Sequence, residues 1–130
     1  MPGKKTHIKV AAAIGGLLAA AYNLSYQKTM MDSDPNYSFK WGQFLLSTCG
    51  GSAIGAAAGM LPDILEPATS CHHRDFFHSF SFITAIGYGL FEADKKMISG
   101  EKKAILNISG AGYLSHLLLD AATPMGLPII

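Results

Sequence analysis

The chain has 130 residues, a length that fits one domain with a single core. Hydrophobic residues make up 49% of it and charged residues only 15%, against about one quarter charged in soluble domains. A net charge of +1 without any basic stripe among aromatic residues predicts no stable binding of nucleic acid. The two cysteines make no disulfide framework, and Cys71, beside several histidines, favours a reducing setting for that region.

Four apolar segments predict four helices, because each is too long for an ordinary strand. They cover residues 8–22, 41–61, 76–91 and 104–122. The first follows a basic start, as in a signal peptide, but we expect it to be the first helix of a bundle. A turn at Asp34 and a break at Gly100 mark two of the linkers. Ser38 is the expected N-cap of the second helix, and Pro62 its expected stop.

Glycines recur every four residues in the second segment, at Gly51, Gly55 and Gly59. Glycine costs about 1 kcal/mol relative to alanine in a helix interior, so the spacing needs a packing reason. We expect a neighbouring helix to approach the backbone closely along this ridge, which could also join two copies of the chain. The pattern favours a membrane protein over a tight soluble bundle, although only this segment clearly reaches the 20 or so apolar residues of a span.

Antiparallel helices joined by these linkers place the end of the second, the start of the third and the end of the fourth at one pole. Imidazole and carboxylate side chains gather there: Asp63, Glu66, His72, His73, His78, His116 and Asp120. Burying such groups without a cation is costly, and they are the ligands of zinc and similar ions. The sequence therefore predicts a divalent metal site, expected to hold zinc, with manganese as the alternative.

His116 and Asp120 are four residues apart on an apolar helix, so both can reach one ion from the same face. For this pair alone, a buried hydrogen-bonded pair is an equal alternative. Asp75 and His78 are three apart, but Asp75 also suits a solvated helix start. Arg74 could bind an anionic substrate, or it could donate hydrogen bonds to a carboxylate that binds the metal.

The order LPD, then HR-x-x-x-HS, then GYLSHLLLDAATPMG resembles the bacterial family of membrane-bound, metal-dependent hydrolases whose expression is often under LexA control. The similarity runs from about residue 59 to residue 127, and the spaced combination is specific. It implies a helical body associated with the membrane, expected to be the bacterial inner membrane, and a divalent-metal site. The implied metal ligands are Asp63, His73, His78, His116 and Asp120. The family is distantly similar to zinc-dependent phospholipase C and to single-strand nucleases, which points to phosphoester hydrolysis.

Two positions depart from the pattern of that family. Leu65 stands where the family has a second acidic residue, and Phe77 stands where it has threonine before the second histidine. Glu66, one residue further on, is the candidate to replace the missing carboxylate. Whether it does so decides how many ions the site holds.

We therefore predict an all-α, antiparallel bundle of about four helices that associates with the membrane and hydrolyses a lipid or another phosphoester. The cation would lower the pKa of a bound water, with Glu66 or Asp75 as proton acceptor and Arg74 binding the substrate. The alternative is a membrane protein without enzymatic activity, in which a structural ion locks the helices together. An open coordination position separates the two, because structural sites close it.

Lys and Arg are more numerous at the opposite end of the bundle, which by the positive-inside rule places the site away from the cytoplasm. That orientation conflicts with the reducing setting favoured by Cys71. A small pore would need ionisable residues along a span, whereas here they gather at one end.

Overall fold

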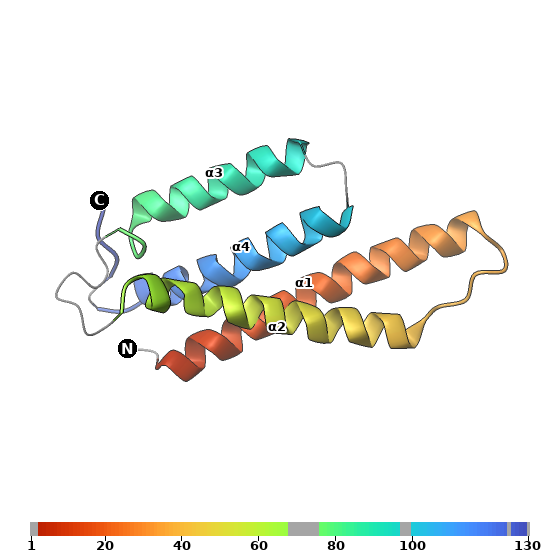
Figure 1. Ribbon diagram of the computed structural model, residues 1–130, viewed down its shortest axis with the longest axis horizontal. Helices are drawn as coiled ribbons and strands as arrows, with labels where there is room; N and C mark the ends of the chain where they lie inside the picture. Colours follow the sequence, from red (N-terminus) through yellow and green to blue (C-terminus); the bar gives the residue numbers. More distant parts are fainter. Residues whose placement is uncertain (1–2, 68–75, 97–99, 125, 130) are drawn as a thin grey trace.

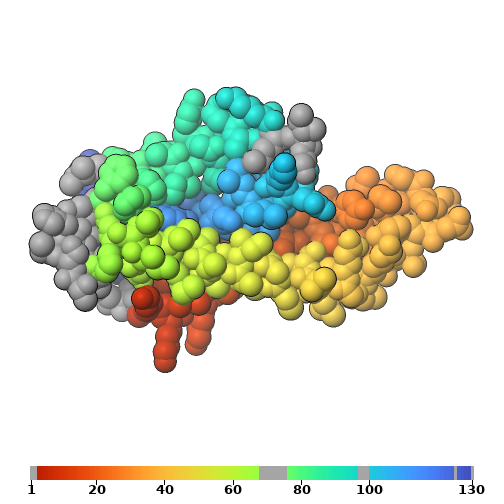
Figure 2. All heavy atoms as spheres, viewed as in Figure 1, coloured from red at the N-terminus to blue at the C-terminus, as the bar shows by residue number. Residues whose placement is uncertain are grey.

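The computed structural model describes residues 3–67, 76–96, 100–124 and 126–129. Within them the chain forms the helices α1 (Lys4–Ser33), α2 (Trp41–Leu65), α3 (Phe80–Lys96) and α4 (Gly100–Ala121). No strand occurs in these ranges, so the predicted all-α fold is confirmed. α1 and α2 form a long hairpin whose far end extends beyond α3 and α4 (Figure 1). The molecule is therefore thick at the pole where the chain begins and thin at the other (Figure 2).

The connection between α1 and α2 differs from the prediction. α1 does not stop near residue 22 but continues to Ser33. Ser38 is not the N-cap of α2, because Lys40 takes that position without a side-chain cap. The buried amide of Gln27 holds the Lys40 backbone instead, accepting its N–H at 2.6 Å and donating to its carbonyl oxygen at 3.2 Å. Two hydrogen bonds from a residue distant in the sequence thus fix the start of α2, where a local side-chain cap was expected.

The predicted stop of α2 at Pro62 is also wrong. Pro62 lies inside the helix and is buried, and the helix runs on to Leu65. The Pro62 carbonyl oxygen accepts the N–H of Glu66 at 2.9 Å, so the last turn closes although proline itself donates nothing. This extra turn carries Asp63.

α3 begins at Phe80 rather than at residue 76, because residues 76–79 form a turn. The Ser79 hydroxyl accepts the N–H of Phe82 at 3.1 Å, as an N-cap side chain does. α4 ends at Ala121, within one residue of the prediction, but it begins at Gly100, which was expected to lie in the linker before a helix starting at residue 104. The turn before α3 therefore becomes a separate element that presents its own side chains.

The predicted glycine ridge is confirmed. Gly51, Gly55 and Gly59 are buried and face α1. A Cβ atom at Gly55 would lie 3.0 Å from the Cα of Gly15 and closer still to a backbone oxygen of α1. α4 meets the same ridge, since a Cβ at Gly112 would lie 2.6 Å from the Gly55 carbonyl oxygen. Two helices of the same chain therefore fill the ridge, and α1, α2 and α4 are in backbone contact.

α1 and α2 are long and apolar enough to cross a membrane. Large apolar side chains lie exposed along both of them: Leu17, Leu24, Leu45, Leu46, Leu61 and Ile64. By contrast, a small core of Tyr113, Leu117 and Leu127 lies beneath α3, and the only helix that α3 contacts among the described helices is α4. The two first helices thus expose the apolar surface that a bilayer would cover.

Candidate metal centre

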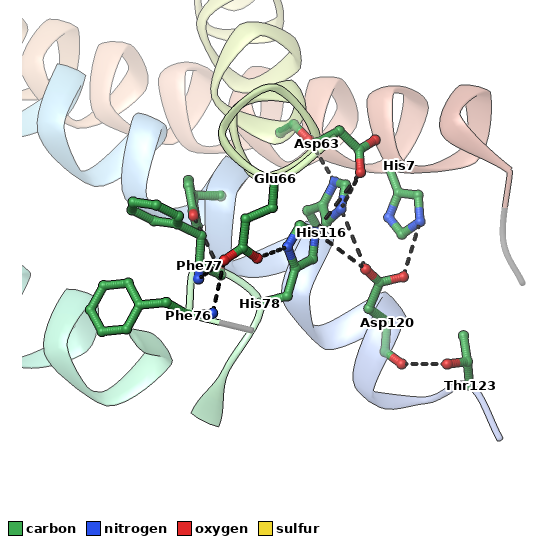
Figure 3. Close-up of polar contacts among 11 residues, drawn as sticks. His7, Asp63, Glu66, Phe76, Phe77, His78, His116, Asp120 and Thr123 are labelled. Carbon is green, nitrogen blue, oxygen red and sulfur yellow. Dashed lines mark hydrogen bonds and ion pairs between the residues drawn. The ribbon is translucent and has the colours of Figure 1, made fainter. Parts of the chain in front are cut away.

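Among the residues that the structure describes, six histidine and carboxylate side chains meet at the pole where α1 begins and α2 and α4 end (Figure 3). They are His7 from α1, Asp63 from α2, Glu66 directly after α2, His78 from the turn before α3, and His116 and Asp120 from α4. His7, His78, His116 and Asp120 are buried, and Asp63 is the most exposed, with 20% of its side chain accessible. The predicted gathering at one pole is therefore confirmed for the residues that the structure describes.

The ring of His116 has a fixed orientation. Its Nδ1 lies 2.7 Å from the carbonyl oxygen of Gly59, and because a carbonyl oxygen only accepts, Nδ1 must carry the proton. The opposite nitrogen, Nε2, is buried and makes no hydrogen bond with the described part of the chain. It faces Oδ1 of Asp63 and Oδ2 of Asp120, each 3.5 Å away. The Nε2 lone pair of His116 is therefore held in a fixed direction, as in histidines that bind metal ions.

His78 has the same arrangement. Its Nδ1 lies 2.9 Å from a carboxylate oxygen of Glu66, and its Nε2 lies 3.8 Å from both Oδ1 of Asp63 and Oδ2 of Asp120. The other Glu66 oxygen accepts the N–H groups of Phe76 and Phe77 at 2.8 and 2.9 Å. Burial raises the pKa of Glu66, but these N–H groups and His78 outweigh it and hold the pKa below its ordinary value.

A carboxylate oxygen of Asp63 and ring nitrogens of His78 and His116 lie close enough to one another to bind one ion. Ligands about 2.0 to 2.1 Å from a tetrahedral zinc stand about 3.4 Å apart. The carboxylate oxygens of Asp63 and Asp120 lie 3.5 Å from Nε2 of His116 and 3.8 Å from Nε2 of His78. Two carboxylates that converge in a largely buried site also call for positive charge between or beside them. Chemistry and spacing therefore agree with a divalent cation.

His7 belongs to the cluster, although no pattern in the sequence singled it out. Its Nε2 lies 3.4 Å from Oδ1 of Asp120, and its ring stacks on that of His116 with centroids 4.0 Å apart. The described residues thus form two groups of possible ligands, one of Asp63, His78 and His116 and one of His7, His116 and Asp120, which share His116. The antiparallel order could have revealed it, because the start of the first helix lies at the same pole as the end of the second.

The predicted site residues divide into two sets. The structure places Nε2 of both His78 and His116 near the carboxylates of Asp63 and Asp120, and it places Glu66 on the Nδ1 side of His78. The other predicted residues, His72, His73, Arg74 and Asp75, lie outside the described residues.

The YdjM inner membrane protein family matches the chain over residues 1–130, its whole length. No curated protein matches the chain, and no solved structure does. The match agrees with the two long apolar helices and places the protein in the bacterial inner membrane, as predicted. It supports the predicted resemblance as far as a family of bacterial membrane proteins. The chain belongs to the YdjM inner membrane protein family.

Proposed function

We propose that this inner membrane protein is a metal-dependent hydrolase that acts on phosphoester bonds of lipids. The observation that carries the proposal is the shared orientation of two imidazoles. His78 and His116 are each held at Nδ1 by an oxygen atom, and both turn Nε2 toward the carboxylates of Asp63 and Asp120. Metal-ligating histidines are held in this way, because the bond at the far nitrogen fixes the ring and its tautomer. Zinc suits this donor set, with manganese as the alternative.

A divalent ion in this position would lower the pKa of a bound water toward neutrality and polarise a phosphoryl oxygen. The chain would supply the rest of the chemistry. Glu66 contacts Nδ1 of His78, the ring nitrogen that faces away from Asp63 and Asp120. We therefore propose that Glu66 orients this ring and that Asp75 is the proton acceptor. Arg74 would bind the substrate anion, and His73 would complete the ligand set.

The position of the cluster along the helices favours a lipid substrate. His7 lies in the first turn of α1, and Asp63 lies in the last turn of α2, and both helices are long enough to span a bilayer. A site at the ends of two spans lies close to the headgroup layer, where phospholipid phosphates are found. Asp63 is also the most exposed member of the cluster, so a substrate would approach from its side.

The second candidate function is structural. Asp63, His78 and His116 come from α2, the turn before α3 and α4, so one ion could tie three segments together. The experiment that separates the two functions incubates the metal-loaded protein with a panel of phospholipids and phosphodiesters. Turnover that a chelator abolishes supports the hydrolase. A metal-loaded protein that turns over none of them, with every coordination position filled by side chains, supports the structural ion.

We expect the purified protein to contain about one to two zinc or manganese ions per chain. The range follows from Asp120, whose Oδ1 faces His7 while its Oδ2 faces His78 and His116, so that one carboxylate could serve two ions. Elemental analysis of protein purified in detergent, before and after treatment with a chelator, measures the content. A folded preparation without stoichiometric metal, unchanged by the chelator, would refute the metal centre.

Glu66→Gln should weaken metal binding by about tenfold to a hundredfold, because the negative acceptor at Nδ1 of His78 is lost while the size of the side chain stays the same. Competition with a metal indicator of known affinity gives the change. Glu92→Gln is the matched control, since that carboxylate lies in α3 and pairs only with Lys95 and Lys96 among the described residues. Equal metal affinity of the Glu66→Gln variant and the wild type would contradict the orienting role.

A further inference from the structure

The first turns of α1 carry a positive surface formed by Lys4, Lys5 and Lys9. All three side chains are exposed, and none forms an ion pair with the described residues. The first turn of the helix contains no acidic residue. Figure 2 shows long side chains at this start of α1, in red, that project away from the body of the molecule. The three positive charges are therefore available to a binding partner outside the chain.

Three of the four lysines in the facing ends of α3 and α4, all except Lys102, behave differently. Lys95 and Lys96 lie 3.4 and 3.7 Å from carboxylate oxygens of Glu92, and Lys103 lies 2.8 Å from Asp94. Acidic residues of the same chain thus balance these charges. The lysines of α1 have no such partners among the described residues, so an external anion would be the first to neutralise them.

The depth of the lysines in the membrane indicates which anion they meet. α1 has 30 residues and so extends about 45 Å, which exceeds the roughly 30 Å of a bilayer's hydrocarbon core. Lys9 is the last charged residue before the long stretch of α1 without charge, which starts at Val10. Lys4, Lys5 and Lys9 therefore lie at the level of the headgroups.

We propose that Lys4, Lys5 and Lys9 form a binding surface for the headgroups of anionic phospholipids. Each lysine near an anionic surface adds roughly a fivefold preference, which salt weakens. Because His7 lies on the same two turns, the bound headgroups hold the titratable cluster at the depth of lipid phosphates. The binding itself needs no hydrolysis. Only its consequence, a high local concentration of phosphate-bearing lipid beside the cluster, rests on the proposed function.

Electron paramagnetic resonance on the full chain in phosphatidylcholine vesicles tests the surface. The vesicles contain a trace of spin-labelled phosphatidylglycerol or spin-labelled phosphatidylcholine, and the spectrum gives the fraction of each held at the protein. The wild type should select phosphatidylglycerol by roughly fivefold or more at low salt and less at high salt. K4Q/K5Q/K9Q should lose at least threefold of this selectivity. Both leaflets have the same composition, so the direction of insertion does not affect the result.

Two variants with three substitutions each serve as controls. K4R/K5R/K9R keeps the charge and should keep the selectivity, whereas K95Q/K96Q/K103Q removes as much charge from lysines already paired and should change it little. The measurements are repeated on chelator-treated protein, so that loss of hydrolysis and loss of headgroup binding are seen separately. A K4Q/K5Q/K9Q protein that selects phosphatidylglycerol as strongly as the wild type overturns the proposal, as does a wild type without selectivity.

Discussion

Replacing Asp120 by Asn, or His116 by Ala, is expected to remove bound metal and to abolish turnover of phosphodiester and phospholipid substrates. Oδ2 of Asp120 lies 3.8 Å from Nε2 of His78 and 3.5 Å from Nε2 of His116. Asp120→Asn therefore removes one negative charge beside both imidazoles. Asn keeps the size of the side chain and so leaves the packing nearly unchanged. Metal content by elemental analysis and the initial rate of hydrolysis are measured on the same preparation.

Asp94→Asn is the matched control for this experiment. Asp94 is an exposed carboxylate in α3, bonded to Lys103, and its loss should leave both metal content and rate unchanged. The two readouts also separate the alternatives. Loss of metal together with loss of thermal stability, in a protein that never showed turnover, would favour the structural ion. A variant of Asp120 that keeps its metal would contradict the proposed ligand set.

Gly55→Leu is expected to lower the free energy of unfolding by roughly 1 to 3 kcal/mol or more, because the new side chain has no space. Even its Cβ would lie 3.0 Å from the Cα of Gly15, with the backbone of α4 on another side. Backbone atoms cannot move aside as a flexible side chain can, so α1 or α4 would have to shift. Thermal unfolding in detergent, followed by circular dichroism, measures the loss.

Gly50→Leu provides the comparison on the same helix. Nothing lies within 4 Å of a Cβ placed at Gly50, and leucine is the better helix former, so stability should stay equal or rise slightly. The pair of variants separates helix propensity from helix packing. If Gly55→Leu unfolds at the same temperature as Gly50→Leu, the ridge is not a contact between helices.

The sequence was sufficient for the helices, the glycine ridge and most of the cluster, because each rests on a regular spacing. Apolar runs longer than strands indicated the helices, and the four-residue repeat of glycine indicated a close neighbour. His116 and Asp120 stand one turn apart, so the helix alone brings them together. Such features depend on local geometry, and local geometry repeats from one protein to another.

The errors arose where a distant residue decides a local structure. Ser38 looked like a cap, but the side chain of Gln27, thirteen residues before Lys40, holds the start of α2 instead. Pro62 looked like a stop, but one missing N–H near the end of a packed helix does not end it. His7 stands alone in a basic start, and only the antiparallel packing of α1 against α4 gives it a partner in Asp120.

The carbonyl oxygen of Gly59 connects the glycine ridge to the candidate metal centre. Gly59 packs against α1 at a distance that leaves no space for a side chain, and its carbonyl oxygen holds Nδ1 of His116. Helices kept apart by side chains can spread when those side chains change rotamer, whereas helices in backbone contact cannot. The orientation of the His116 imidazole therefore depends on the close spacing of the helices. Exchanging the exposed leucines should therefore leave metal affinity unchanged, whereas one methyl group at Gly59, which would meet Ala11 and the Gly112 carbonyl oxygen, should weaken it.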